Sequence, residues 1–451
     1  MYSRRVQNLT VGRMDGNGSA LLKGINSVRP SSLPFLPNLR QLIWSDVGNW
    51  LGAEVSDAIV FLHAAMQRCH FYLGVQDDIR PLSILMETIP IHCPSLVSLE
   101  IYVWPSVGLL NPLISLLANL PHLVEITIPS FPDVSRILMA LSNRPKLKVL
   151  QFCYPTAIKN NVFATSFVHT ITSPENPSVG DFSLLEVFEF HAQKNATLSP
   201  FFQLGALRLH SLNIAVSSLD VDEDLSPESF IRSISRACSG LSNLKLVYRY
   251  QSDNTLSQKK ALDFDDLRDL LLCTSMTHLE LAAPYLVLSD SDIRDMAQAW
   301  PSLRRLASYS HNSGPRPGNA KSLSLWSVFL LTRLCPQIED IALDINTRVS
   351  ETPSFSSSIP STGQVADLRF LDVGRLPLHS GDEVDLAKLL GQICGPKCHV
   401  VYDRLEEVSD QYEEVASRWV TVTTLMQHFS ELYSNVRSLE LEIASLRTQI
   451  T

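Results

Sequence analysis

The sequence predicts an α/β fold built from repeated strand–helix units. Three observations indicate it: a short apolar phrase that recurs along the chain, amphipathic segments between its copies, and a proline that often separates the two. The phrase has the form apolar-x-x-apolar-x-apolar, as in "LPNLRQLIW" at 36–44 and "WPSLRRLAS" at 300–308. Recurrence of such a phrase at a regular spacing is typical of a leucine-rich-repeat-like solenoid.

The second apolar anchor of the phrase marks each repeat. Neighbouring anchors lie 24 to 38 residues apart, so the repeats are irregular in length. Alternation of apolar and polar residues after the anchor predicts a short strand with one buried face. "CHFYLGV" at 69–75, which supplies the anchor at 72, fits the pattern weakly. The anchors are expected at 9, 42, 72, 99, 126, 150, 188, 212, 244, 279, 306, 341 and 371.

Helices are expected between these strands, because apolar residues recur there at intervals of three and four. The expected helices cover 112–120, 134–144, 229–238, 264–273, 292–300 and 325–335. Asp263 and Ser289 offer side-chain oxygens where two of them should begin. A proline such as Pro301 cannot donate to a continuing helix and therefore ends it just before the next strand. The repeats predict one solenoid domain over 1–400, with surface loops at 154–181 and 349–364.

Composition narrows the function classes. The chain has 451 residues, 45% of them hydrophobic, and a net charge of −9, which argues against sequence-independent binding to nucleic acid or to anionic membranes. No apolar stretch reaches the roughly 18 residues that span a bilayer. Eight scattered cysteines without an apolar export signal predict reduced core thiols, in the cytoplasm or nucleus.

Motifs that would carry catalysis or hold a cofactor are weak. "GNGSAL" at 16–21 lacks the third glycine of a dinucleotide fingerprint, and "DVDEDL" at 220–225 has Leu225 where a calcium loop needs glycine. "CGPKCH" at 394–399 has near-ligand spacing for zinc, but no second cluster accompanies it, so a turn with core thiols is favoured over a metal site. We therefore expect no enzyme activity, no catalytic residue, no metal and no cofactor.

A binding surface is expected instead on the open face of the strands. Residues beside each anchor point away from the core because side chains alternate across a strand. Exposed aromatic and arginine side chains on a rigid framework are typical of protein interfaces, although ordinary solvated strand positions would show the same pattern. The residues predicted to bind protein are Tyr102, Trp104, Glu125, Glu189, His191, Lys245, Arg249, Glu280 and Arg305.

The C-terminal segment 401–451 predicts a separate helical region with a heptad repeat over about 422–450. Apolar residues fill eight successive places of a 4-3 pattern, the signature of a coiled coil. Glu442 and Arg447 are spaced to pair between two parallel chains. Two interpretations stay open: a parallel homodimer, or a helix that folds back and caps the last repeat. The eight residues are Leu425, Phe429, Leu432, Val436, Leu439, Ile443, Leu446 and Ile450.

The stretches "VLSDSDIRDMAQAWPSLRRL" at 287–306 and "LSLWSVFLLTRLCPQIEDIALDI" at 323–345 resemble the F-box/leucine-rich-repeat proteins of mushroom-forming basidiomycete fungi. In that family an N-terminal F-box docks on the Skp-type adaptor of a cullin ubiquitin ligase, and the repeats hold the substrate. The chain starts inside its first repeat, so we expect either a gene model that lost its 5′ end or a repeat-only relative. The Skp-type adaptor is a partner only if an F-box is missing upstream.

The resemblance and the surface together predict a non-catalytic protein-binding scaffold, the substrate-recognition part of an F-box-type ubiquitin ligase. The alternative is a scaffold that associates with itself through the C-terminal coiled coil and has no role in a ligase.

Overall fold

A computed structural model describes eighteen stretches of the chain. They are residues 5–12, 16–28, 34–46, 55–73, 79–131, 134–142, 144–153, 182–192, 202, 207–216, 227–248, 262–283, 286–310, 323–346, 368–374, 378, 381–402 and 410–450. The predicted loops 154–181 and 349–364, the motif at 220–225 and Arg249 lie outside them.

The chain divides into two compact units. Unit 1 comprises Met1–Asp224 with Arg236–Cys238, and unit 2 comprises Leu225–Ser235 with Ser239–Thr451. Both units are mixed α/β, with parallel strands that follow one another in chain order and helices between them. The α/β class predicted from the sequence is therefore confirmed. The predicted boundary near residue 400 stays a prediction.

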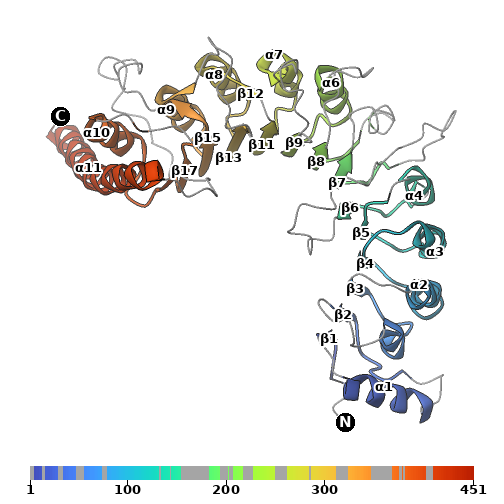
Figure 1. The fold of residues 1–451 in the computed structure, drawn as a ribbon. Coiled ribbons are helices and arrows are strands. Elements are labelled where there is room, and N and C mark those ends of the chain that lie inside the picture. The colour runs from blue at the N-terminus through green and yellow to red at the C-terminus, as the bar shows by residue number, and fades with distance from the viewer. Residues whose placement is uncertain are drawn as a thin grey trace. The chain divides into compact units, whose positions relative to one another are not determined.

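The described residues of unit 1 form eight parallel strands with helices between them. Helices α2, α3 and α4 lie along one side of the strands (Figure 1). The strands are β1 (Asn8–Val11), β2 (Gln41–Asp46), β3 (Arg68–Leu73), β4 (Ser98–Tyr102), β5 (Glu125–Pro129), β6 (Val149–Cys153), β7 (Val187–Ala192) and β8 (Ser211–Val216). The helices are α1 (Gly16–Val28), the 3-10 helix η2 (Val55–Phe61), α2 (Arg80–His92), α3 (Val107–Ala118) and α4 (Ser135–Leu141).

Unit 2 repeats this arrangement. Its described strands in the long parallel sheet are β9 (Asn243–Tyr248), β11 (His278–Ala283), β13 (Arg305–Ser310), β15 (Asp340–Leu343), β17 (Phe370–Asp372) and β18 (His399–Val401). Two short pairs accompany it, β10 (Leu262–Asp263) with β12 (Leu286–Val287), and β14 (Leu323–Ser324) with β16 (Ile345–Asn346). The helices are α6 (Pro227–Ala237), α7 (Phe264–Leu267), η5 (Arg268–Leu272), α8 (Asp290–Ala299), α9 (Leu325–Leu334), α10 (Glu383–Ile393) and α11 (Asp410–Ile450).

In each unit the predicted anchors align with one another across neighbouring strands and form the row of side chains that faces the core, which we call the core row. One predicted anchor is an exception. In unit 1 the register aligns Leu42, Leu99 and Ile126 with their neighbours, and in unit 2 it aligns Leu279 and Leu306. The anchor predicted at 72 is wrong, because Cys69 pairs with both Leu42 and Leu99 and is fully buried. A small thiol serves as the anchor there, and the register moves Tyr72 to the opposite face.

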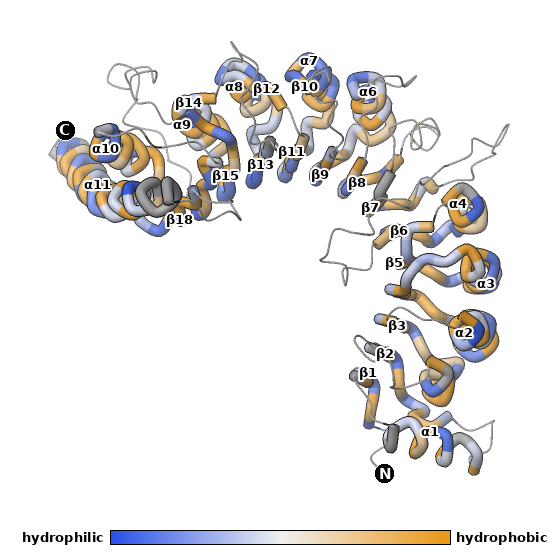
Figure 2. Tube along the Cα trace, viewed as in Figure 1, coloured by the Kyte–Doolittle hydropathy of each residue, from blue (hydrophilic) through white to orange (hydrophobic). Residues whose placement is uncertain are grey.

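The expected helices are present with shifted ends. Polar and apolar residues share each helix, as an amphipathic helix requires (Figure 2). Helix α3 begins at Val107 and contains Pro112, where the sequence predicted a start. The segment predicted as one helix over 264–273 is a short α-helix followed by the 3-10 helix η5.

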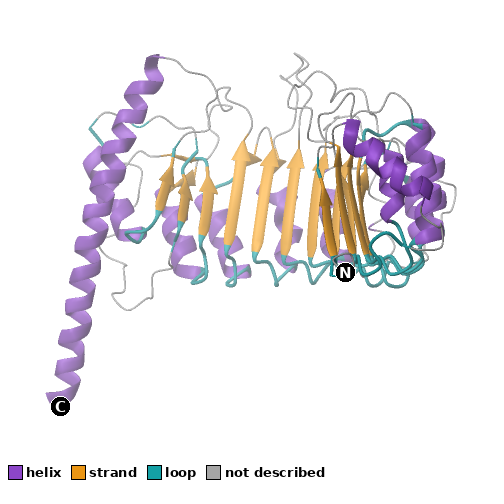
Figure 3. Ribbon diagram, turned by 90° about the horizontal axis from the view of Figure 1, so that it is seen from below, coloured by secondary structure: helices purple, strands orange, loops and turns teal. Residues whose placement is uncertain are grey.

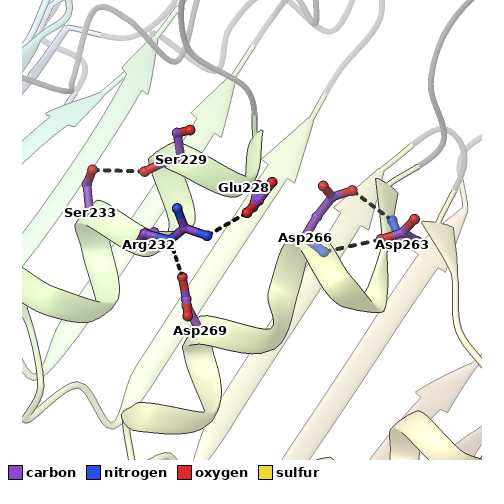
Figure 4. A network of polar contacts seen from close by, with 7 residues as sticks. All are labelled: Glu228, Ser229, Arg232, Ser233, Asp263, Asp266 and Asp269. Carbon is purple, nitrogen blue, oxygen red and sulfur yellow. Dashed lines mark hydrogen bonds and ion pairs between the residues drawn. The ribbon is translucent and has the colours of Figure 1, made fainter.

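Polar side chains fix the helix starts in unit 2 (Figure 4). The predicted cap Asp263 forms a capping box with Asp266, so each side chain accepts a hydrogen bond from the other residue's backbone N–H. Arg232 of α6 donates to Asp269 of η5 at 2.7 Å and to Glu228 one turn earlier in its own helix. The contact between Arg232 and Asp269 joins the neighbouring helices α6 and η5.

Helix α11 has a packed half and an exposed half. Trp419, Val422 and Met426 are buried, and Ser430 donates to the backbone oxygen of Cys394 at the end of α10. Farther along, the helix extends beyond the strands of unit 2 (Figure 3), and its large apolar side chains are about half exposed. The exposed heptad residues are Leu432, Val436, Leu439, Ile443 and Leu446.

Candidate protein-binding surface

The candidate surface of unit 1 is the face of the strands opposite the core row. Strand β3 shows how it arises, since its residues alternate between buried and half-exposed positions from Arg68 to Leu73. Register then aligns the outward residues of neighbouring strands into rows. One such row, which we call the polar row, consists of His70, Glu100, Thr127, Gln151, Glu189 and Asn213.

Hydrogen bonds between side chains link most of the polar row. Thr127 donates to Gln151 at 3.1 Å, and Gln151 donates to Glu189 at 3.1 Å. Asn213 donates to the other oxygen of Glu189 at 2.9 Å. Each bond spans two adjacent strands, so the partners hold one another in fixed rotamers. The row therefore presents preorganised polar groups rather than mobile side chains.

His70 and Glu100 form the other linked pair of the polar row. His70 Nδ1 lies 2.9 Å from Glu100 Oε2. This contact, the largest influence, lowers the pKa of the Glu100 carboxyl. Glu100 is therefore ionised at neutral pH, and its negative charge lies at the centre of the β3–β4 face.

Two tyrosines stack beside this carboxylate. Tyr72 and Tyr102 are register partners, with ring centroids 4.6 Å apart and ring planes inclined by 8°. The hydroxyl of Tyr72 donates to Glu100 at 3.2 Å. Burial, followed by the charge of Glu100 and more weakly that of Glu189, raises the pKa of the Tyr102 phenol. Both rings are therefore neutral aromatic groups next to negative charge.

The structure brings together some of the predicted binding residues of unit 1. Tyr102 belongs to the tyrosine pair and Glu189 to the polar row, while Glu125 is exposed at the start of β5. Trp104 follows β4 and is half-buried. His191 lies in β7, but its side chain is outside the described part of the structure.

Sequence reasoning missed His70 and Tyr72. Both follow from the misplaced anchor: with the core position assigned to 72, the outward residues of β3 could not be recognised. The signal was present, because Cys69 and Phe71 are the apolar residues that alternate with His70 and Tyr72. A cysteine taken as a small hydrophobic residue would have given the correct register.

The strand face of unit 2 carries a different charge pattern. Lys245 Nζ lies 2.8 Å from Glu280 Oε1, and Arg305 lies 3.7 Å from the other oxygen of the same carboxylate. Three predicted residues thus meet in one cluster, with two cations around one anion. Burial, followed by the charges of Arg305 and Arg304, lowers the pKa of His278 beside this cluster.

The motif with near-zinc spacing holds two buried thiols and an exposed histidine. Cys394 and Cys398 are both 3% exposed, whereas His399 is exposed. The hydrogen bond between the thiols, followed by burial, raises the pKa of Cys394. Among the residues that the structure describes, no three His, Cys, Asp or Glu side chains are placed to share a metal ion.

Two further observations concern the cysteines and the possibility of a membrane-spanning helix. None of the eight cysteines, all of which lie in described stretches, forms a disulfide, and seven of them are buried. Within the described ranges, no helix combines the length and apolar character needed to cross a membrane.

Comparison with known proteins assigns the chain to no family. The chain matches no protein-family model and no curated protein sequence.

Proposed function

We propose that the strand–helix units stack as a leucine-rich-repeat-like solenoid. A recurring pair of backbone hydrogen bonds supports this proposal. The carbonyl of Thr277 accepts from the N–H groups of both Arg304 and Arg305, and that of Arg304 accepts from Glu339 and Asp340 in the next repeat. The same pair of bonds recurs between repeats of unit 1. Identical contacts from one repeat to the next are what nearest-neighbour stacking requires.

We propose further that the chain is a non-catalytic scaffold that binds a protein on its strand faces. The observation that carries this proposal is the polar row with its tyrosine pair. Polar and aromatic groups there stand outside the core and are held in place by their own hydrogen bonds. Rigid aromatic and charged side chains are the groups that dominate protein interfaces.

The specific role we propose is substrate recognition in an F-box-type ubiquitin ligase, in the cytoplasm or nucleus. This step rests on the resemblance of 287–345 to F-box/leucine-rich-repeat proteins. A Skp-type adaptor would then join through an F-box upstream of the repeats.

Affinity purification from cells that express the chain tests both protein binding on the strand face and the role in a ubiquitin ligase. The face variant Tyr102→Ala/Glu189→Ala is compared with Ile84→Ala/Glu87→Ala, whose residues lie on helix α2. Proteins recovered with the wild type and the α2 variant, but lost with the face variant, support binding on the strand face. An identical set from all three would reject it. A face-dependent set without a Skp-type adaptor or a cullin would reject the ligase role alone.

A second candidate function is self-association through α11. The packed half of this helix is engaged by α10, while the exposed half presents apolar side chains at successive heptad positions. In a parallel pair, Glu442 at position g would face Arg447 at position e of the other chain. We propose a parallel homodimer formed by 432–450, with the packed half serving as the cap of the last repeat.

Sedimentation velocity over a range of concentrations tests the homodimer. The wild type should show reversible, concentration-dependent dimers, because burying the exposed heptad residues removes apolar surface from water. Leu439→Asp should be monomeric throughout, since it places a charge in the dimer core. Ser434→Asp, at the outer position f, should dimerise like the wild type. A monomeric wild type, or equal loss in both variants, would contradict the homodimer.

A further inference from the structure

The ring faces of the tyrosine pair differ in their surroundings. Side chains stand roughly perpendicular to a sheet, and the rings of Tyr72 and Tyr102 on adjacent strands are stacked face to face. One face of Tyr72 therefore contacts Tyr102, and the other is directed toward the register partner of Tyr72 on β2. That partner is Ser45, a small residue that is itself half-exposed. A planar group can approach Tyr72 from this side.

The charge around the tyrosine pair is negative. Glu100 accepts from Tyr72 and contacts His70, and Glu189 accepts from two neutral amides. The outward positions in line with the tyrosines and those of the polar row include no lysine or arginine, counted over the described strands of unit 1.

Unit 2 provides the contrast within the same chain. Its carboxylate Glu280 is already paired with Lys245 and Arg305. An incoming cation would have to displace a lysine and an arginine there, whereas in unit 1 it would meet a carboxylate held by His70 and Tyr72 next to an aromatic ring. The two strand faces are therefore suited to different ligands.

We infer that the unit 1 strand face binds a basic segment of a partner protein, through an arginine that stacks on Tyr72 and pairs with Glu100. The proposal rests on the protein-binding function proposed above and names the chemistry of its partner. A guanidinium group fits because it is planar, stacks on aromatic faces and donates two parallel hydrogen bonds to a carboxylate. The negative face also attracts a basic segment before contact, an effect that added salt weakens.

Fluorescence anisotropy with labelled octapeptides tests this inference on the full chain. The probes are peptides of alternating glycine and arginine, glycine and lysine, or glycine and glutamate. The arginine peptide should bind more tightly than the lysine peptide, and the glutamate peptide should not bind. Raising the salt concentration should weaken the binding of the arginine peptide.

Matched variants separate a specific site from general attraction to an acidic protein. Tyr72→Leu and Glu100→Gln should each lower affinity about five- to tenfold, the range expected for a partly desolvated cation–π contact or charged pair. Tyr309→Leu in unit 2 and Glu87→Gln on α2 should change affinity less than about twofold. Thermal melting establishes that all four variants are folded.

The outcomes distinguish this inference from the proposed function. Equal losses in Glu100→Gln and Glu87→Gln, or equal affinity for the lysine and arginine peptides, would overturn the arginine site. No binding of any peptide, together with a partner set that still depends on Tyr102 and Glu189, would also overturn it while leaving the protein-binding function in place.

Discussion

Tyr72 and Tyr102 stack across two neighbouring strands with their ring centroids 4.6 Å apart, and Tyr72 donates to the carboxylate of Glu100, two residues before Tyr102. The arrangement depends on register: Cys69 and Leu99 share the core row, which places the two tyrosines opposite each other three residues later. A one-residue shift of β3 would turn Tyr72 into the core and separate the two rings. The surface and the core of unit 1 are thus specified by the same alignment.

The core row of unit 2 predicts a strong effect of charge at Leu306, which is 1% exposed. Leu306→Asp should lower the free energy of unfolding by about 3–5 kcal/mol, because the carboxylate would lie unpaired among apolar neighbours. Leu272→Asp makes the same chemical change at a side chain that is 62% exposed, and should cost less than about 0.5 kcal/mol. Urea unfolding measures the free energy of unfolding of both variants. Similar values would contradict the register that places Leu306 in the core row.

The contact between α8 and α9 depends on Asp290. Its carboxylate accepts hydrogen bonds from the backbone N–H and hydroxyl of Ser324, at 2.9 and 2.6 Å, and from the hydroxyl of Ser327. Asp290→Ala should therefore lower the free energy of unfolding by about 2–3 kcal/mol. It removes a charged acceptor and leaves the donors of Ser324 and Ser327 without this partner.

Asp295→Ala serves as the control for Asp290, because Asp295 is exposed on the same helix. Its effect on the free energy of unfolding should stay within about 0.5 kcal/mol. Chemical denaturation of the two variants measures the difference. Equal losses would mean that helix propensity in α8, and not the link to α9, sets the stability.

Unit 1 should lose stability in mild acid because of His63. Burial, with a smaller contribution from the charge of Arg40, lowers the pKa of His63 below its usual 6.5, and its Nδ1 accepts from the N–H of Ala65 at 3.3 Å. The unfolded chain therefore takes up a proton near pH 6.5, while the folded chain does so only at lower pH. The stability that neutral His63 contributes is present above pH 6.5 and is lost as the pH falls toward the folded pKa.

Comparison with His63→Gln isolates this effect from the other titrating groups. The wild type should lose stability relative to the variant between pH 7.5 and pH 5, by about 1.4 kcal/mol for each unit by which the pKa is lowered. Urea unfolding at several pH values gives the two curves. Parallel curves would contradict a neutral His63 in the folded protein.

Local patterns in the sequence identified the elements that depend on local chemistry. Anchors such as Leu306 could be predicted because a strand with one buried face must alternate, and Pro301 lies in the turn that follows α8. The anchor of β3 was misplaced because Cys69 was not counted as a core residue, although Cys69 and Phe71 alternate with His70 and Tyr72. The pairing of Cys69 with Leu42 and Leu99 fixes the face on which Tyr72 lies.

The heptad at the C-terminus shows a second limit of sequence reasoning. The 4-3 pattern predicted a helix with one apolar stripe, and α11 is a helix over Asp410–Ile450. The pattern does not contain the second stripe, Trp419, Val422 and Met426, which is buried. Trp419 stacks on Tyr402, the residue that follows β18. The close approach of α10, at its residue Gly391, is a tertiary feature that the heptad pattern does not contain.

Gly391 is a glycine on α10 at a point where α11 approaches closely. A Cβ atom at this residue would lie 2.7 Å from Phe429 Cβ and 3.1 Å from the backbone nitrogen of Ser430. The first distance is too short for a methyl group and the second is tight, so Gly391→Ala should push the helices apart. The cost should be about 1–3 kcal/mol, larger than the gain in helix propensity of about 1 kcal/mol.

Gly24→Ala is the matched control, because Gly24 is exposed on α1 and a Cβ there meets no atom within 4 Å. It should stabilise the protein by up to about 1 kcal/mol through propensity alone. Hydrogen exchange measured by mass spectrometry should show faster exchange over 418–433 in Gly391→Ala and no change there in Gly24→Ala. If the packed half of α11 caps unit 2, its loosening should also speed exchange in α10 and β18; protection of both at the wild-type level would show that the cap does not stabilise the sheet it covers.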